Sequence, residues 1–353
     1  MVLPTRRPED GHLIRVGIIG YGQIGRTHRD ALAACRGARL IAVSSRREPP
    51  PEPGVSWHAD YRELLQRPDI DLVAVCTPSG DHAAQALAAL EAGKGVVVEK
   101  PLALSVQDGA AVVRAARERN LFLSVVSQRR TEPACRALRD ALVGGHLGRP
   151  VLAEALVRWS RDQRYYDAAP WRGTRSMDGG VLLNQAIHAI DLIVWLLGPV
   201  AEVSGATATL VRRIEAEDTA AATLRFVGGA IGVIAATTAV TPGSPAELNV
   251  FAERGVVSLH DARVVRWEGA GLPPPPTAEQ PGGGGADPAA IGSLGHRRQW
   301  EDIIVAFQEG GDPLVTGEAG LATLATILAV EKASRTGRTV RPDIPELRTE
   351  THS

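Results

Sequence analysis

The chain is poor in cysteine. It has only three, Cys35, Cys76 and Cys135, and no two of them are closely spaced. A disulfide framework uses paired cysteines and a structural zinc site uses short, repeated spacings, so neither is expected. We expect reduced and mostly buried thiols, which are typical of a cytoplasmic protein.

Long apolar runs and net charge are also lacking. The most apolar stretch, Ile187 to Val200, is interrupted by His188, Asp191 and Pro199, and a membrane span needs about 18 or more apolar residues. The segment Met1 to His12 has no apolar core, so no secretory signal is expected. A net charge of −1 gives no general electrostatic basis for binding nucleic acid or an anionic membrane. We therefore expect a cytoplasmic protein whose partners are small molecules.

A glycine-spaced turn follows the first apolar run. Ile14 to Ile19 suit a buried strand, and Gly20, Tyr21, Gly22, Gln23, Ile24 and Gly25 lead into a helical stretch. In such a turn the first glycine allows the sharp bend, the second lets a pyrophosphate approach the backbone, and the third lets the helix pack closely. The second apolar run, Leu40 to Val43, follows at the spacing of a βαβ unit. We predict a dinucleotide site here; the alternative is a tight structural turn in another α/β protein.

The end of the second strand indicates which dinucleotide binds. NAD-binding proteins place a carboxylate about 20 residues past the glycines, whereas this chain has Ser44, Ser45, Arg46 and Arg47 there. Hydroxyl and guanidinium groups match a 2′-phosphate in charge and hydrogen-bonding geometry. The sequence therefore favours NADP. If the arginines are ordinary solvated charges, the choice is relaxed and NAD is possible.

The first part of the chain continues as alternating strands and helices. Buried strands are predicted at Leu72 to Cys76, Val96 to Val98 and Leu121 to Val126, which indicates a doubly wound parallel sheet with ligands at the carboxyl ends of its strands. Lys100 is predicted to be functional at this edge; the alternative is a side chain that only reaches solvent. The Lys100–Pro101 bond is a candidate for cis geometry. The cofactor residues expected at the later strand ends are Thr77, Pro78, His82, Glu99, Lys100 and Gln128, with Arg129 toward substrate.

After about residue 130 the pattern changes to a largely antiparallel sheet. The predicted strands are Val151 to Trp159, Val200 to Arg213, Thr219 to Val227, Ile231 to Val240, Leu248 to Ala252, Val256 to Leu259 and Val264 to Trp267. Gly269 to Gly295 is rich in Pro and Gly and is predicted to be a mobile surface loop without a catalytic part. Helices are predicted near Arg297 to Gln308 and Glu318 to Thr336. The predicted domains are residues 12–130, which bind NAD(P), and residues 131–353, which bind substrate and form oligomers.

One helix between these strands carries an unusual polar stripe. Val181 to Leu197 is almost wholly apolar but contains Asn184, His188 and Asp191, which at about 100° per residue share one face. Either the stripe faces a cleft, with His188 as proton acceptor, or the histidine and the carboxylate satisfy each other in the core. Further ligands at suitable spacing are lacking, so no metal site is expected.

Taken together, these motifs resemble the glucose-fructose oxidoreductase, inositol dehydrogenase and rhizopine-catabolism (Gfo/Idh/MocA) family. The resemblance rests on the glycine turn and on the motifs Thr77-Pro78, Glu99-Lys100-Pro101, Trp171-Arg172-Gly173 and Gly179-Gly180 leading to Asn184 through Asp191. It implies an N-terminal Rossmann domain and a C-terminal α+β domain with a large, mostly antiparallel open sheet that builds a homodimer or homotetramer.

The resemblance also implies that Lys100 and His188 flank the substrate carbon. Many members have an aspartate at the position of Asn184, so here the amide is expected to orient substrate or His188. Asp178 stands where the first of three glycines is common.

The predicted function is that of an NADP-dependent oxidoreductase acting on a secondary alcohol or ketone of a sugar, cyclitol or nucleotide-linked sugar. Its catalytic residues are predicted to be Lys100, His188 and Asn184. Tyr165, Tyr166, Trp171 and Arg172 are predicted to line the substrate pocket, with Trp171 and Arg172 also near the cofactor; core packing is the alternative for the aromatic residues. Two other functions stay open: a glycosidase that retains NAD and uses it transiently, and a dinucleotide sensor without chemistry.

Overall fold

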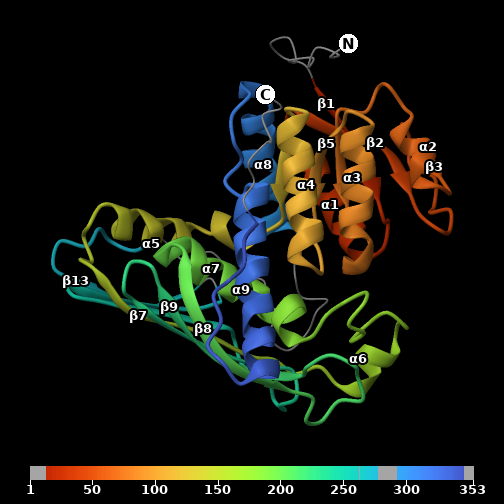
Figure 1. The fold of residues 1–353 in the computed structure, drawn as a ribbon. Helices are drawn as coiled ribbons and strands as arrows, with labels where there is room; N and C mark the ends of the chain where they lie inside the picture. Colours follow the sequence, from red (N-terminus) through yellow and green to blue (C-terminus); the bar gives the residue numbers. More distant parts are fainter. Residues whose placement is uncertain (1–12, 262, 277–291, 346–353) are drawn as a thin grey trace, which may run out of the picture. The chain divides into compact units, whose positions relative to one another are not determined.

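The computed structural model describes residues 13–261, 263–276 and 292–345, and the chain divides into two compact units (Figure 1). The described part of the first unit consists of the residues up to Gln128, Ser293–Leu321 and Pro345. The second unit consists of Arg129–Gly292 and Ala322–Ile344. The predicted division into 12–130 and 131–353 therefore needs a correction, because Ser293–Leu321 belong with the first unit.

The first unit is built on a six-stranded sheet whose neighbours are all parallel, in the order β3-β2-β1-β4-β5-β6. This is the doubly wound Rossmann sheet that the sequence predicts. Its central strands β4 and β5 are continuous apolar runs, as suits strands that are covered on both faces. The order reverses between β1 and β4, so their carboxyl ends form the switch point where such sheets bind ligands. The strands are β1 (Ile14–Ile19), β2 (Ala38–Ser44), β3 (Ser56–His58), β4 (Leu72–Val75), β5 (Gly95–Val98) and β6 (Leu123–Val125).

Helices pack against this sheet in pairs. Helix α1 contacts α8, and α3 lies beside α4 (Figure 1). From α8, Trp300, Ile303 and Ile304 are buried in the same core cluster as Ile14 and Val16 of β1, which is why this late segment belongs to the first unit. The helices are α1 (Gln23–Ala33), α2 (Tyr61–Leu65), α3 (His82–Glu91), α4 (Val106–Glu118), α8 (Leu294–Glu309) and the short η1 (Ser79–Asp81).

The second unit is built on a seven-stranded sheet in the order β13-β12-β11-β7-β10-β9-β8. Its neighbours are antiparallel except for the parallel pair β7 and β10, so the predicted mostly antiparallel sheet is confirmed. Helix α7 packs on β7 and β11, and α5 packs on α7. The strands are β7 (Pro150–Arg158), β8 (Val200–Ala208), β9 (Thr219–Phe226), β10 (Ile231–Thr237), β11 (Glu247–Ala252), β12 (Gly255–His260) and β13 (Arg263–Gly269). The helices are η2 (Gln128–Thr131), which begins at the last residue of the first unit, α5 (Pro133–Val143), α6 (Gln163–Asp167), η3 (Leu182–Ala186), α7 (Ile187–Leu197) and α9 (Gly317–Thr336), which begins in the first unit.

Two predicted segments differ from the structure or extend past it. The strand predicted to reach Arg213 ends at Ala208, because the Asp218 carboxylate accepts hydrogen bonds from the backbone N–H groups of residues 210, 211 and 212 and curls the chain into a loop. Most of the predicted loop from Gly269 to Gly295 lies outside the described residues, which stop at 276 and resume at 292. Among the described helices, none is both long enough and apolar enough to cross a membrane.

Candidate active site

The glycine turn has the three distinct environments that a dinucleotide site requires. Gly20 has a φ of 92°, and a Cβ there would lie 2.7 Å from the backbone of Cys76. A Cβ at Gly25 would overlap the carbonyl oxygen of Gly20. At Gly22, by contrast, a Cβ would meet nothing within 4 Å. The fold itself therefore requires the first and third glycines, while the second leaves space beside the backbone.

Helix α1 offers positive potential next to that space. Gly22 is its N-cap, no side chain caps it, and its first turn has no acidic residue. The first N–H groups of a helix, here including those of Gln23 and Ile24, have no intrahelical acceptors and carry partial positive charge. These residues fit a pyrophosphate, which binds at helix N-termini of this kind.

The loop after β2 is held by hydrogen bonds to its backbone carbonyl groups, and it carries exposed cationic side chains. The Ser45 hydroxyl donates to the Arg47 carbonyl at 2.7 Å, and the Trp57 indole donates to the Ser45 carbonyl at 3.1 Å. Ser44 is buried, whereas Arg46 and Arg47 are exposed. Residues 44–47 contain no carboxylate, so nothing in this stretch repels a phosphate.

His82 joins the loops that follow β4 and β5. Its buried ring has Nδ1 at 2.7 Å from the Pro101 carbonyl and Nε2 at 2.9 Å from the Thr77 carbonyl, and burial lowers the pKa of His82. Thr77 also donates its hydroxyl to Gln85 at 2.7 Å, and Pro78 is the N-cap residue of η1. The structure thus places His82 as a bridge between two strand-end loops.

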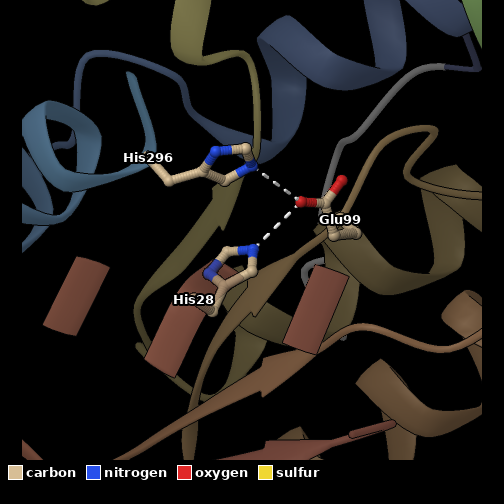
Figure 2. A group of neighbouring side chains, drawn as sticks. All are labelled: His28, Glu99 and His296. Atoms are coloured by element: carbon tan, nitrogen blue, oxygen red, sulfur yellow. Dashed lines mark hydrogen bonds and ion pairs between the residues drawn. The ribbon is translucent and has the colours of Figure 1, made fainter. Parts of the chain in front are cut away.

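Glu99, at the end of β5, is buried between two histidines (Figure 2). Its Oε1 lies 2.9 Å from His28 Nε2 and 3.3 Å from His296 Nε2, and its Oε2 accepts the Lys100 N–H at 3.1 Å. Burial acts to raise the pKa of Glu99, but the hydrogen bonds from the two imidazoles outweigh it and hold the pKa well below the usual value. Glu99 is therefore a buried carboxylate with three N–H donors.

The same three side chains have the spacing of a metal site, but their protons argue against one. His28, Glu99 and His296 have ligand atoms within 4.8 Å of one another. The Trp300 indole N–H donates to His28 Nδ1 at 2.9 Å, so Nδ1 is the acceptor and the proton of the neutral ring is on Nε2. Burial lowers the pKa of His28, which favours that neutral ring. A protonated Nε2 has no lone pair for a metal ion, so this group is a hydrogen-bonded cluster.

Lys100 and Gln128 lie at neighbouring strand ends of the same sheet. Lys100 is half-buried, and its bond to Pro101 is cis, as predicted. Gln128 begins η2, and its side chain lies against the first turn of α8, where a Cβ on Gly295 would be 3.0 Å from its Cγ. The first unit thus collects the predicted residues of the glycine turn, Thr77, Pro78, Glu99, Lys100 and Gln128 at the carboxyl ends of its strands.

In the second unit, the apolar helix exposes two residues. From Val181 to Val194, Asn184 and His188 are half-buried and every other side chain is buried. The helix begins as the π-helix η3 and continues as α7, and π-helical turns are frequent at functional sites. The polar stripe predicted from the sequence therefore exists at Asn184 and His188.

Asp191 does not belong to that stripe. Its buried carboxylate accepts two hydrogen bonds from Arg130, at 2.7 and 2.6 Å, and one from Thr323 at 2.9 Å. Through these contacts with Arg130 and Thr323, Asp191 holds η2, α7 and α9 together.

Two further carboxylates lie around the start of this helix. Glu217 Oε1 accepts the Leu182 N–H at 3.0 Å, as suits an anion at a helix N-terminus. The buried Asp178 accepts the Gly173 N–H at 2.7 Å and the Asn184 side-chain N–H at 2.5 Å. Asn184 is thereby hydrogen-bonded to a carboxylate that the sequence places six residues earlier.

Aromatic rings and guanidinium groups gather beside α6. The Arg172 guanidinium lies 4.3 Å from the Tyr165 ring centre, and that of Arg161 lies 5.5 Å from it. Arg172 also lies 5.5 Å from the ring centre of Trp171 and donates to the Tyr165 carbonyl at 2.7 Å. Tyr165, Trp171 and Arg172 are half-buried, whereas Arg161 is buried. We call this cationic and aromatic group, of which Tyr165, Trp171 and Arg172 reach the surface, the arginine–tyrosine cluster.

Two other predicted substrate residues have structural contacts. Tyr166 is buried, with its hydroxyl 2.8 Å from that of Thr238, and burial raises its pKa to about 12. Arg129 pairs with Glu132 at 3.4 Å. For Tyr166, core packing is the environment that the structure shows.

The residues that hold Glu99 and Asn184 in place could not be identified from the sequence. Neither His28 nor His296 lies near Glu99 in the chain, and Trp300 lies farther away still. In the sequence, Asp178 stands out only as a departure from a glycine. The one available signal was its place ahead of Asn184.

The fold and the site together define a dinucleotide-binding oxidoreductase. A family model described as "Oxidoreductase family, NAD-binding Rossmann fold" matches residues 14–127, and one described as "GFO/IDH/MocA C-terminal domain" matches residues 135–258. The chain belongs to the Gfo/Idh/MocA family of oxidoreductases, as its motifs predict.

Several relatives are similar over nearly their whole length. The chain is 31% identical to the 1,5-anhydro-D-fructose reductase of Ensifer adhaerens, over 92% of this chain and 97% of that protein. It is 27% identical to the myo-inositol 2-dehydrogenase of Thermotoga maritima, over 93% and 98%. Among solved structures, the WlbA dehydrogenase from Bordetella pertussis in complex with NADH and UDP-GlcNAcA is 33% identical over 93% of this chain and 98% of its own, with a TM-score of 0.82.

Proposed function

We propose that this protein is a dehydrogenase or reductase that moves a hydride between nicotinamide C4 and a secondary alcohol or ketone carbon of a sugar-type substrate. The observation that carries the proposal is the exposure pattern of the helix from Val181 to Val194, which is buried except for Asn184 and His188. Burying polar groups is costly, so an amide and an imidazole that alone reach the surface of an apolar helix are well suited to meet a ligand. The named activities of the relatives in Ensifer and Thermotoga support the same reaction class.

In this proposal His188 and Lys100 share the substrate oxygen. His188 takes the hydroxyl proton during oxidation and returns it during reduction, because an imidazole exchanges protons near neutral pH. Lys100 donates a hydrogen bond to that oxygen and stabilises negative charge as it develops. The bound nucleotide supplies the hydride acceptor or donor, and the described residues of the glycine turn hold its pyrophosphate.

We propose an anionic sugar derivative, such as a nucleotide-linked sugar acid, as substrate. The arginine–tyrosine cluster packs two guanidiniums on one tyrosine ring, and that of Arg172 is half-exposed. Guanidiniums bind carboxylate and phosphate with planar, two-point geometry. The complex of the Bordetella relative with UDP-GlcNAcA supports this choice. The names of the other relatives suggest an inositol or a neutral sugar, but such a substrate has no carboxylate or phosphate for the guanidinium groups of the cluster to bind.

We further propose that the cofactor is NADP(H), with NAD(H) as the weaker alternative. The loop after β2 has Arg46 and Arg47 exposed and no carboxylate from 44 to 47. The Bordetella relative is in complex with NADH, so the proposed preference rests on the residues of the present chain alone. A charge-assisted hydrogen bond is worth about 1.5–3 kcal/mol, so replacing both arginines by alanine should lower kcat/KM about tenfold or more for NADPH and much less for NADH. An equal loss for the two cofactors, or a preference of the unaltered protein for NADH, would contradict the assignment.

Self-association through the sheet of the second unit is part of the same proposal. On β9 and β10 the side chains that face away from the buried side are mostly small or apolar, among them Ala221, Thr223, Ile231 and Val233, with Arg225 as a charged exception. Such a face suits a homodimer or homotetramer, and sedimentation equilibrium of the purified protein measures which is present.

The test of the reaction itself is turnover of a panel of nucleotide-linked sugars, sugar acids, inositols and keto-sugars, followed at the nicotinamide absorbance band. His188→Ala should lower kcat about 10²- to 10⁴-fold and leave the Kd of the nucleotide unchanged. The matched control is His146→Ala, which removes an exposed histidine of the same unit and should have no effect. Near-normal turnover of His188→Ala would contradict the assigned role.

A further inference from the structure

Asp178 is a buried carboxylate with two well-defined partners in the second unit. One oxygen accepts the backbone N–H of Gly173 at 2.7 Å, and the other accepts a side-chain N–H of Asn184 at 2.5 Å. The residue is 2% exposed. It therefore ties the loop after Trp171 and Arg172 to the half-exposed amide on η3.

The contact fixes which way the Asn184 amide is turned. An ionised carboxylate accepts hydrogen bonds and donates none, so only the NH₂ end of the amide can face Asp178. The carbonyl oxygen then points away from Asp178. An asparagine without such a partner has two amide orientations that differ by half a turn about its last bond, and they present opposite hydrogen-bonding groups.

The second contact links the same carboxylate to the chain segment that carries Trp171 and Arg172 of the arginine–tyrosine cluster. Gly173 directly follows Trp171 and Arg172, and Arg172 stacks on Tyr165. Asp178 also donates its own N–H to the Thr174 carbonyl at 3.2 Å. The buried Asp178 side chain thus holds both the loop that carries Arg172 and the side-chain amide of Asn184.

We infer that Asp178 is a positioning residue that holds Asn184 with its carbonyl oxygen toward the reacting group. This inference rests on the proposed function. A carbonyl oxygen accepts hydrogen bonds only from donors, so the partner of the Asn184 oxygen is a substrate hydroxyl or a protonated nitrogen of an imidazole ring. The chain therefore uses an amide fixed by a buried carboxylate as a pure acceptor.

The experiment is a four-member cycle: the unaltered protein, Asp178→Asn, Asn184→Asp and the double variant that exchanges the two side chains. Asp178→Asn pairs two amides, so residue 178 can pair with either end of the Asn184 amide. Asn184→Asp places two carboxylates side by side, which repel each other when both are ionised. The exchanged pair restores one amide and one carboxylate, keeps an acceptor for the Gly173 N–H, and presents acceptor oxygens at position 184 in either orientation. Asp140→Asn, on an exposed part of α5, is the matched control.

We expect Asp178→Asn to lower kcat about 10-fold to 10²-fold, the scale of a misplaced catalytic contact, with the KM of the nucleotide unchanged. Asn184→Asp should lower the melting temperature on the order of 5 °C, and the exchanged pair should recover both the melting temperature and most of kcat. Recovery of the melting temperature without recovery of kcat would show a purely structural contact and overturn the inference, as would additive effects on stability. If the unaltered protein turns over no member of the panel, the proposed function fails instead, and the melting temperatures still decide whether the two side chains are coupled.

Discussion

Glu331 makes the stability of the second unit depend on pH near neutrality. It lies on α9 and is largely buried; burial and the neighbouring Glu217 carboxylate raise its pKa from 4.5 to about 7, and Arg175 and Arg335 only partly oppose this. Because the folded state binds the proton more tightly than the unfolded state, this contribution to stability is complete below pH 4.5 and is lost as the pH rises through 7. The full effect is about 3 kcal/mol.

The substitution Glu331→Gln keeps the uncharged shape at every pH. The gain in unfolding free energy of the variant over the unaltered protein should be small at about pH 5 and grow to about 2–3 kcal/mol at about pH 8. Urea unfolding followed by tryptophan fluorescence at several pH values measures this difference. The control Glu91→Gln replaces an exposed carboxylate on α3 and should show no such slope. A gain that is the same at every pH would refute the role assigned to the Glu331 carboxyl group.

Two further predictions concern contacts described above. Gly25→Ala should destabilise the first unit, because the added methyl group overlaps the Gly20 carbonyl, whereas Gly22→Ala should keep the melting temperature and weaken nucleotide binding; equal behaviour of the two variants would contradict the separate roles. Asp191→Asn should cost about 3–5 kcal/mol of unfolding free energy because it leaves the Arg130 guanidinium buried without a counter-ion. A loss below about 1 kcal/mol, the size typical of an exposed pair, would show that solvent reaches the pair.

Much of the fold could be predicted because its strands have local signatures. The continuous apolar runs of β4 and β5 are buried, β1 is buried except at Arg15, and β9 alternates buried and outward residues as its sequence does. The placement of α8 could not be predicted in this way. Its apolar face indicates a helix, but nothing local tells that the face packs beside β1, almost the whole chain length away.

The residues of the candidate site also differ in whether the sequence alone reveals them. The glycine turn and the pair of Asn184 and His188 are visible in the sequence because each has a spacing with a physical meaning. Asp191 shares that spacing, yet its role was decided by Arg130, which comes from a different element. Periodicity shows which residues share a face of a helix, but it does not show what that face meets.

The polar cluster around Glu99 has a consequence for biosynthesis. Its carboxylate and His28 belong to segments that leave the ribosome early, whereas His296 and Trp300 come from α8, close to the end of the chain. Until α8 is made, the early segment lacks part of its core and one donor to a buried charge. The nucleotide-binding unit is thus encoded first but completed late, and a chain truncated before α8 would lack the supports of the strand end that carries Lys100.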